Sequence, residues 1–321
     1  PEAEAHAQID LSLERGINFL DTAEMYPVNP VSKETIGRTE EIIGNWIAAN
    51  PARRGDFILA TKHSGEGMAH VRDGAPISAA TIAETIEGNL RRLKTDYIDL
   101  YQFHWPNRGS YMFRKNWAYE PGGSSRQEVV DNMHECLEAL QVQVDKGNIR
   151  HFGLSNESAW GTSQWLRLSE THGLPRVQTM QNEYSLLCRL YDTDMAELSV
   201  YEDVGLITFS PLAAGLLSGK YQGDQVPDAS RRSFVNNLGG RVTPRVFDAV
   251  DAYLAVAQKH GVDPIHMALA WCHTRPFMCS AIFGATTMDQ LEHILDGADV
   301  VLSQECLDDL NAAHKAHPMP Y

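Results

Sequence analysis

Four ionisable side chains stand close to the ends of three apolar runs in the first third of the chain. Asp21, Lys62 and His104 each terminate such a run, and Tyr26 follows Asp21 by five positions. A phenol, with an unperturbed pKa of about 10, is a poor acid at neutral pH, but a neighbouring ammonium favours the phenolate. With Asp21 holding the lysine charged and His104 donating or accepting at the same oxygen, the set suits protonation of a carbonyl oxygen as a hydride reaches its carbon.

Each of these residues also has an ordinary alternative role. A single Asp or His at a strand end often caps the chain or is a satisfied polar group, and Lys62 alone would be an exposed lysine. Tyr26 alone would be a lid aromatic. Because the C-terminal ends of consecutive parallel strands meet at one face, finding all four groups at such ends favours the catalytic interpretation.

The rest of the chain alternates between strand and helix patterns. The expected strands are 18–23, 57–62, 98–103, 150–154, 177–181, 205–209 and 279–283. The expected helices are 2–15, 34–49, 78–93, 127–146, 158–172, 192–202, 244–260, 264–274, 287–296 and 303–315, with a Pro-containing loop that runs to about Ser32. This alternation predicts an α/β fold with a parallel sheet, a (β/α)8 TIM barrel. Seven strands are found, and the chain opens without Met inside a helical pattern, so we expect the first strand to be missing from this sequence.

Two long segments, 105–125 and 210–241, leave from strand ends. Loops of this length in a compact domain are usually functional. The first is rich in aromatic side chains that, with Met25, either form an apolar substrate wall or pack within the loop: Trp105, Tyr111, Phe113, Trp117 and Tyr119. No linker of biased composition interrupts the chain, so residues 1–321 are expected to form a single domain.

Composition excludes several classes of protein. A formal net charge of −15 argues against a nucleic-acid surface, which needs clustered Lys and Arg. No apolar run approaches membrane-spanning length, so no membrane association is expected. The five cysteines (Cys136, Cys188, Cys272, Cys279 and Cys306) are widely spaced, which favours free thiols in a reducing cytoplasm. Nothing in the sequence indicates an oligomeric state.

Several motifs together resemble the aldo-keto reductase family, most nearly its Tas-type bacterial members. They are GINFLDTAEMY at 16–26, FILATK at 57–62, TDYIDLYQFHWP at 95–106, GLSN at 153–156 and SPLAAGLLSGKY at 210–221, with the runs AEMYPV and GATTMDQL. The resemblance covers the whole chain. It implies a (β/α)8 barrel that binds NADPH without a Rossmann domain, with an N-terminal hairpin absent from this sequence. Asp21, Tyr26, Lys62 and His104 match the family's catalytic tetrad, with Tyr26 as general acid.

The resemblance also implies which residues hold the cofactor. Ser155, Asn156 and Gln181 match positions that bond the nicotinamide carboxamide, and Phe209 matches an aromatic that stacks on the ring. Small residues of a loop that wraps the pyrophosphate allow close backbone approach. The remaining matches are Ser210, Pro211, Leu212, Ala213, Ala214, Gly215 and Leu216 in that loop, Lys220 and Arg231 at the phosphates, and Gly284, Thr286 and Gln290 at the adenosine. The ordinary alternatives are a helix cap for Ser155 and Asn156, and a core position for Phe209.

Some positions depart from the family's pattern. His293 and Ile294 stand where many relatives carry an acidic residue and an Asn, and Thr286 replaces an Arg that often accompanies the 2′-phosphate. The phosphate would then depend on Lys220, Arg231 or Arg232. We therefore expect NADP(H), with NAD(H) as the alternative.

The leading hypothesis is an NAD(P)H-dependent reductase that converts a small-molecule aldehyde or ketone to an alcohol, with Met25 and Trp105 contacting the substrate. A second is a cofactor-sensing regulatory subunit, because β subunits of voltage-gated potassium channels share the fold and tetrad. A third is a metal-dependent barrel hydrolase using Asp21, His63 and His104. No H-x-H pair occurs at a strand end, so no metal site is expected.

Overall fold

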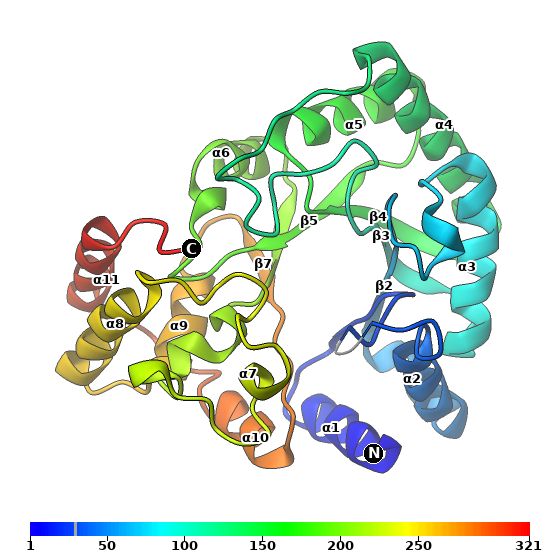
Figure 1. The fold of residues 1–321 in the computed structure, drawn as a ribbon. Coiled ribbons are helices and arrows are strands. Elements are labelled where there is room, and N and C mark those ends of the chain that lie inside the picture. The colour runs from blue at the N-terminus through cyan, green and yellow to red at the C-terminus, as the bar shows by residue number, and fades with distance from the viewer. Residues whose placement is uncertain (29–30) are drawn as a thin grey trace. The chain divides into compact units, whose positions relative to one another are not determined.

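The computed structural model describes residues 1–28 and 31–321, so residues 29–30 of the loop expected before Ser32 lie outside the described part (Figure 1). The chain forms two compact units. Pro1–Ser110 with Tyr119–Met180 makes the first, and Tyr111–Ala118 with Gln181–Tyr321 makes the second. In the described residues, no helix has the length and apolar character needed to cross a membrane.

Four parallel strands form the sheet of the first unit and pair in chain order: β1 (Phe19–Asp21), β2 (Ile58–His63), β3 (Ile98–Phe103) and β4 (Ile149–Ser155). Asp21 is paired with Ala60, and Lys62 with Gln102. β3 is buried along its whole length, as expected for a strand covered on both faces, although it includes the polar residues Asp99 and Gln102. The register therefore brings Asp21, Lys62 and Gln102 to the C-terminal ends of neighbouring strands.

Helix α1 (Glu2–Glu14) precedes β1, and one helix follows each strand of the first unit: α2 (Arg38–Ala49), α3 (Ala79–Leu93), α4 (Arg126–Asp145) and α5 (Ala159–His172). The unit also contains the 3-10 turns η1 (Pro51–Asp56) and η2 (Arg72–Gly74). Helices α2 to α5 lie side by side in chain order (Figure 1). Ser78 and Ser125 begin α3 and α4 with capping boxes, each satisfying two backbone N–H groups. The helices thus begin where their sequences predict.

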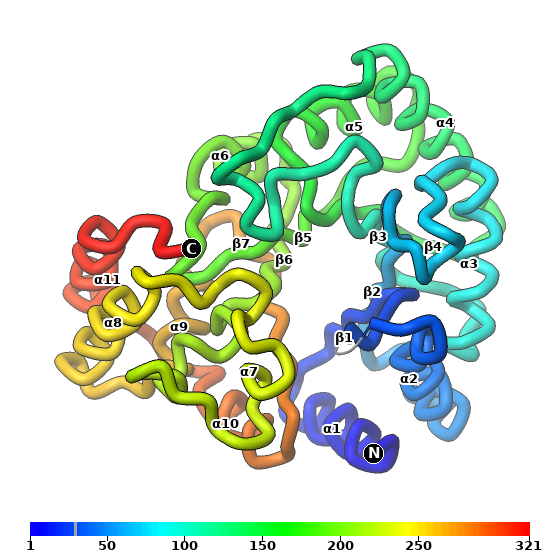
Figure 2. Tube along the Cα trace, in the orientation of Figure 1, coloured from blue at the N-terminus to red at the C-terminus, as the bar shows by residue number. Residues whose placement is uncertain are grey.

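The second unit holds β6 (Gly205–Phe209) and β7 (Met278–Ala281), which are parallel; β5 (Val177–Glu183) crosses the boundary between the units. Its helices are α6 (Asp194–Tyr201), α7 (Arg231–Phe234), α8 (Val246–His260), α9 (Pro264–His273), α10 (Met288–Asp296) and α11 (Gln304–Ala316), with turns η3 (Leu190–Asp192), η4 (Ala213–Ser218) and η5 (Gln222–Asp224). Helix α8 lies beside α9 and α11 (Figure 2). Tyr184 stacks on Trp271 in the core, with ring centroids 5.0 Å apart.

The expected alternation of strands and helices is confirmed, and seven strands occur among the described residues in the order β1 to β7. The largest difference concerns the strand expected at 18–23, which covers only Phe19–Asp21. The ladder nevertheless continues, because Thr22 N donates to Ala60 O at 2.9 Å and Glu24 N to Lys62 O at 3.2 Å. The segment 210–241, for which the sequence indicated no helix, contains η4, η5 and α7.

Candidate active site

A buried ion pair joins the ends of β1 and β2. Lys62 Nζ donates to Asp21 Oδ2 at 2.5 Å and to the carbonyl of Thr22 at 2.8 Å. The lysine side chain is fully buried, and such a charge is tolerated only where partners replace its water. Gln102 Nε2 donates to the other carboxylate oxygen, Asp21 Oδ1, at 3.2 Å. The lysine is therefore held charged and in one position.

Tyr26 lies beside this ion pair. Its backbone N–H closes a turn on Ala23 O at 3.0 Å, and its side chain is half-buried. Lys62 Nζ lies 5.2 Å from the centroid of the Tyr26 ring. The His104 ring meets the same phenol edge-on, with centroids 5.7 Å apart. The structure thus brings all four tetrad positions together within the first unit.

His104 follows β3 and is held through its backbone. Its N–H donates to His63 O at 2.9 Å, and its carbonyl accepts from Asn156 Nδ2 at 2.9 Å. Burial, followed by the charge of Lys62, holds the pKa of His104 well below its usual 6.5. The imidazole is therefore neutral at neutral pH, with one N–H donor and one acceptor. Among the described residues its buried Nδ1 has no partner.

Glu24, which the sequence did not single out, fastens the tyrosine loop to β2. Ser64 N donates to Glu24 Oε1 at 2.6 Å, and Arg72 pairs with Glu24 Oε2 at 2.5 Å. Glu24 precedes Tyr26 by two positions, and Ser64 follows Lys62 by two positions. The one sequence feature that indicates this supporting role is that Glu24 lies between Asp21 and Tyr26.

His63 belongs to this supporting network and not to a metal centre. Its ring contacts Ser64 O at 2.7 Å and Thr81 Oγ1 at 3.0 Å. Burial lowers its pKa to about 4, although the charge of Glu24 opposes the shift. The groups of described His, Cys, Asp and Glu residues close enough to share an ion do not include Asp21, His63 or His104.

The two expected substrate contacts lie beside Tyr26. Met25 is buried with Ala23 and Val71, and Tyr26 and Trp105 pack against the same cluster. The Trp105 ring also contacts the His104 ring at 4.8 Å, and its Nε1 donates to Glu66 O at 3.1 Å. These contacts give the tyrosine an apolar neighbourhood on one side.

The other aromatic residues of the 105–125 segment divide between the units. Tyr119 belongs to the first unit, whereas Tyr111, Phe113 and Trp117 belong to the second. Trp117 is 57% exposed and stacks on the Arg245 guanidinium at 5.0 Å. Of the expected wall, Met25 and Trp105 therefore lie beside the tetrad within the first unit.

Trp105 and Ser155 also line a cavity of about 240 Å³, together with Phe103, Leu154 and Trp165. Side chains alternate between the faces of a strand, so Phe103 faces away from its neighbour Gln102, which contacts Asp21. None of the four tetrad residues lines this cavity. Of the two expected substrate contacts, Trp105 lines this cavity and Met25 does not.

Ser155 and Asn156 end β4 next to His104. Asn156 adopts a left-handed backbone with φ 55°, and its Nδ2 bonds both the His104 carbonyl and Ser155 Oγ. Its Oδ1 is buried and has no partner within residues 1–28 and 31–321. An amide N–H2 would satisfy this acceptor, so the site fits the carboxamide of a nicotinamide.

The expected pyrophosphate loop, in the second unit, has an unusual backbone. Ser210, Ala213, Ala214 and Gly215 all have positive φ, at 54°, 49°, 57° and 94°. Successive residues of this kind can form anion-binding turns, although Ala213 N and Gly215 N already donate to Ser210 O at 2.8 Å and to Leu212 O at 2.9 Å. Lys220 is exposed and makes no ion pair with any described residue, so its charge is available to a phosphate. A Cβ at Gly215 would lie 2.9 Å from Lys220 Cε, and the glycine gives the lysine room.

The remaining cofactor positions also lie in the second unit. Gln181 is buried on β5, and Phe209 is half-buried at the end of β6. At the adenosine positions, Gly284, Thr286 and Gln290 are exposed, and the Gln290 side chain accepts from Thr286 N at 2.9 Å. These residues form a surface at the start of α10.

The three basic positions differ. Arg232 is buried and bonds Asp224 and the carbonyls of Gln225 and Asn236, so its charge is used within the protein. Arg231 starts α7 and is exposed. Lys220 and Arg231 therefore remain as candidates for the cofactor phosphates.

Comparison with known proteins agrees with this geometry. A sequence model of the Aldo/keto reductase family matches residues 1–315. The chain is 39% identical to Protein tas of Escherichia coli (strain K12) over 325 residues, covering 99% of this chain and 91% of that protein. It is 30% identical to the uncharacterized oxidoreductase YrpG of Bacillus subtilis (strain 168), covering 97% and 86%. It is also 30% identical to a probable voltage-gated potassium channel subunit beta of Arabidopsis thaliana, covering 98% and 88%.

These matches cover almost the whole chain, and the parallel strands with intervening helices are consistent with a (β/α)8 barrel. The expected family resemblance and fold class are therefore confirmed. This chain belongs to the aldo/keto reductase family.

Proposed function

We propose that this protein reduces an aldehyde or ketone to an alcohol with NAD(P)H as hydride donor. Membership of the family supports an oxidoreductase, and the family generally uses nicotinamide cofactors. The observation that carries the proposal is the buried Lys62–Asp21 pair beside the phenol of Tyr26. A proton donor next to a fixed ammonium is what a carbonyl oxygen needs as it gains negative charge.

Each residue of the tetrad has one role in the proposed reaction. A bound reduced nicotinamide supplies the hydride to the carbonyl carbon. Tyr26 gives its phenolic proton to the carbonyl oxygen, and the Lys62 ammonium stabilises the phenolate that remains. Asp21 keeps that ammonium in place, and the neutral His104 orients the carbonyl through a hydrogen bond. Solvent then returns the proton to Tyr26.

The cofactor proposed is NADP(H), with NAD(H) as the alternative. Asn156 Oδ1, lacking a partner among the described residues, and the adjoining Ser155 suit the carboxamide. Lys220 and Arg231 would hold the phosphates on the left-handed loop that begins at Ser210. All five cysteines are free thiols, which supports a reducing cytoplasm as the proposed location.

The test of catalysis is Tyr26→Phe. We expect kcat for a reactive test aldehyde to fall by about 10²–10⁴, the usual contribution of a positioned general acid. Binding of NADPH, followed by fluorescence, should be unchanged because Tyr26 holds no cofactor group in this scheme. Tyr201→Phe is the matched control, since Tyr201 is 81% exposed on α6. A Tyr26→Phe protein with wild-type turnover would refute the proposed acid.

A regulatory subunit that senses the cofactor is a second candidate, because the chain is 30% identical to a probable voltage-gated potassium channel subunit beta. The two functions differ in turnover. NADPH and NADH should first be titrated separately, and aldehydes, ketones and sugars then screened with the tighter cofactor. Many turnovers per protein support the enzyme, whereas tight cofactor binding without steady turnover supports the sensor.

A further inference from the structure

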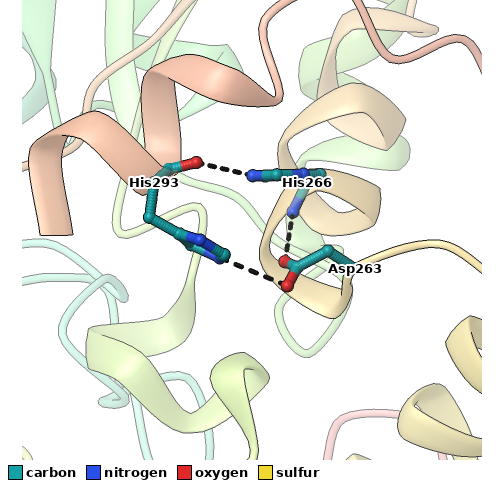
Figure 3. Close-up of side chains that lie close together, drawn as sticks. All are labelled: Asp263, His266 and His293. Carbon is teal, nitrogen blue, oxygen red and sulfur yellow. Dashed lines mark hydrogen bonds and ion pairs between the residues drawn. The ribbon is translucent and has the colours of Figure 1, made fainter. Parts of the chain in front are cut away.

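Three potential metal ligands meet between helices α9 and α10 of the second unit, outside the candidate active site. Asp263 precedes α9, His266 lies in its first turn, and His293 lies near the end of α10 (Figure 3). One ligand atom from each residue lies within 4.8 Å of the other two. Two imidazoles and a carboxylate are a common ligand set for Zn²⁺.

The hydrogen bonds around the cluster resemble those that orient metal ligands. His266 Nε2 contacts the carbonyl of His293 at 2.6 Å. A carbonyl only accepts, so Nε2 is the donor, and Nδ1 is the ring nitrogen left to bind a metal. Metal-binding histidines usually donate their other ring N–H in this way, which fixes the tautomer. The His266 ring is thus already in a metal-binding form.

Asp263 divides its two oxygens between two tasks. Its Oδ1 caps α9 by accepting from Ile265 N at 2.8 Å and His266 N at 3.2 Å. Its Oδ2 faces His293 Nε2 at 3.2 Å. The cap therefore orients the carboxylate and leaves Oδ2 directed at the second histidine (Figure 3).

Packing keeps the two rings together. The imidazoles of His266 and His293 are stacked, with centroids 4.8 Å apart and planes inclined by 29°. A Cβ at position 297 would lie 2.2 Å from His266 Cδ2, so Gly297 is what allows the ring to lie there. The backbone of this region thus accommodates the ring in its observed position.

A second group of potential metal ligands in the same unit differs from this cluster because a lysine contacts it. His260, Glu305 and Asp309 also cluster, but Lys259 Nζ lies 2.6 Å from Asp309 and 3.3 Å from Glu305. A lysine therefore already neutralises one of the two carboxylate charges of that cluster. Within the described part of the chain, Asp263 pairs with no Lys or Arg, and its only ionisable partner is His293.

We propose that Asp263 Oδ2, His266 Nδ1 and His293 Nε2 bind one Zn²⁺ ion, with water as the fourth ligand. Tetrahedral zinc at its usual bond lengths places ligand atoms about 3.4 Å apart, so the cluster must contract. The stacked His293 ring must also turn so that its Nε2 lone pair is directed at the ion. The His293 side chain is 47% exposed and can move to do so. Binding uses the lone pair of His293 Nε2, so the ion displaces any proton held there to solvent, and the ring N–H is then on Nδ1, which takes its proton from solvent. The ion would join α9 to α10, the helix that follows the adenosine positions.

The experiment is to dialyse the metal-free protein against Zn²⁺ and measure bound zinc by elemental analysis. We expect one Zn²⁺ per chain and a higher midpoint of thermal unfolding with zinc present. His293→Gln and Asp263→Asn should each weaken binding at least about tenfold. Asp263→Asn keeps a side-chain oxygen for the helix cap, so its loss of binding would report the carboxylate and not unfolding.

Two control variants separate this site from other ligands on the surface. His260→Gln alters the cluster that Lys259 contacts, and Cys279→Ser removes the exposed thiol; both should bind zinc as the wild type does. The proposal is overturned if the wild type binds no zinc, or if a His266→Gln/His293→Gln protein binds it as tightly as the wild type. Zinc analysis and unfolding require no turnover, so these results are independent of the proposed reductase activity.

Discussion

Two buried acid–base clusters lie at opposite ends of β3 in the first unit. Near its start, Asp99 pairs with Arg54 at 2.8 Å and with Arg150 at 2.9 Å. Beyond its end, His104 lies with Lys62 and Asp21, whose ion pair measures 2.5 Å. Both clusters contain a buried carboxylate on a strand of the same sheet. Because their positions in the fold are similar, differences in how their polar atoms are bonded point to different roles.

The cluster around Asp99 is closed. Its Oδ2 accepts from Leu59 N as well as from Arg54. Arg54 also donates to Thr95 Oγ1 and to the carbonyl of Tyr97, and its guanidinium lies 3.9 Å from the Tyr97 ring centroid. No side-chain atom of Asp99 or Arg54 appears among the buried groups that lack partners in the described chain.

The cluster around Lys62 is open. His104 Nδ1 and Asn156 Oδ1 are buried, and neither has a partner among the residues described. A buried polar atom without a partner costs stability, about 1–3 kcal/mol. A bound ligand could supply the missing hydrogen bonds to these atoms. Buried polar atoms without a partner are therefore expected at functional sites more than at structural ones. In the closed cluster every side-chain contact joins parts of the protein, whereas the open cluster leaves two buried polar atoms that a ligand could bond.

The largest expected effect comes from removing the cation of the open cluster. Lys62→Met should lower kcat by about 10²–10⁴, because Tyr26 loses the charge that stabilises its phenolate. It should also destabilise the fold by about 3–5 kcal/mol, since Asp21 is left buried without its partner. Steady-state kinetics and urea unfolding measure the two effects separately.

An Asp21→Asn/Lys62→Met protein is the matching control. Replacing both charges removes the uncompensated carboxylate, so most of the stability should return. Activity should not return, because the ammonium is still absent. Recovery of turnover together with stability would show that Lys62 supports the fold alone.

The next effect tests the closed cluster. Arg54→Met should destabilise the protein by about 3–5 kcal/mol, because both oxygens of Asp99 stay buried and one loses its cation. In conditions where the variant is folded, kcat should equal that of the wild type. Urea unfolding and active-site-normalised kinetics provide the measurements. A fall in kcat as large as that of Lys62→Met would contradict the separation between the two clusters.

Sequence reasoning reached the open cluster and missed the closed one for a physical reason. Asp21, Lys62 and His104 each end an apolar run, and parallel strands bring their C-terminal ends together whatever the intervening helices contain. Arg54 lies in a 3-10 turn, 45 positions from Asp99 in sequence, and no periodic pattern links the two. The alternation of strand and helix patterns predicts at which end of a strand a residue lies. It does not predict which side chain, distant in sequence, that residue contacts.

The same limit applies to the support of Tyr26. Arg72, which pairs with Glu24, lies in a turn where its own φ is 47° and that of Asp73 is 53°. Asp73-Gly74 is a turn signal, but Arg72 is not a residue type that favours a left-handed backbone, so the sequence does not predict its conformation. The strand 98–103 was predicted with its observed bounds because apolar or aromatic residues occupy four of its six positions, whereas β1 is shorter than predicted.

A smaller effect follows from pH. Burial holds the pKa of His104 well below 6.5 in the folded protein, whereas the unfolded chain titrates near its ordinary value. Below pH about 6.5 the unfolded state therefore binds a proton that the folded state does not, and stability falls as pH falls. His104 alone should contribute about 1 kcal/mol of loss between pH of about 6.5 and 5.5. His63, with a pKa of about 4, adds a loss of the same sign.

Urea unfolding at several pH values measures this slope. His104→Gln removes one titrating group, so its slope should be shallower than that of the wild type. Arg54→Met should keep the wild-type slope despite its lower stability, because the closed cluster contains no histidine. Equal slopes for the wild type and His104→Gln would mean that His104 titrates similarly in the folded and unfolded chains.

The smallest effect separates the two arginines of the closed cluster. The Arg150 side chain is 53% exposed, whereas that of Arg54 is 9% exposed. Arg150→Met should therefore cost only about 0.2–1 kcal/mol, and the loss should shrink as salt is added, because solvent and ions screen an exposed pair. Urea unfolding at low and high salt tests this. If Arg150→Met cost as much as Arg54→Met at high salt, the stability of this cluster would depend on the number of cations around Asp99 and not on which of them is shielded from water.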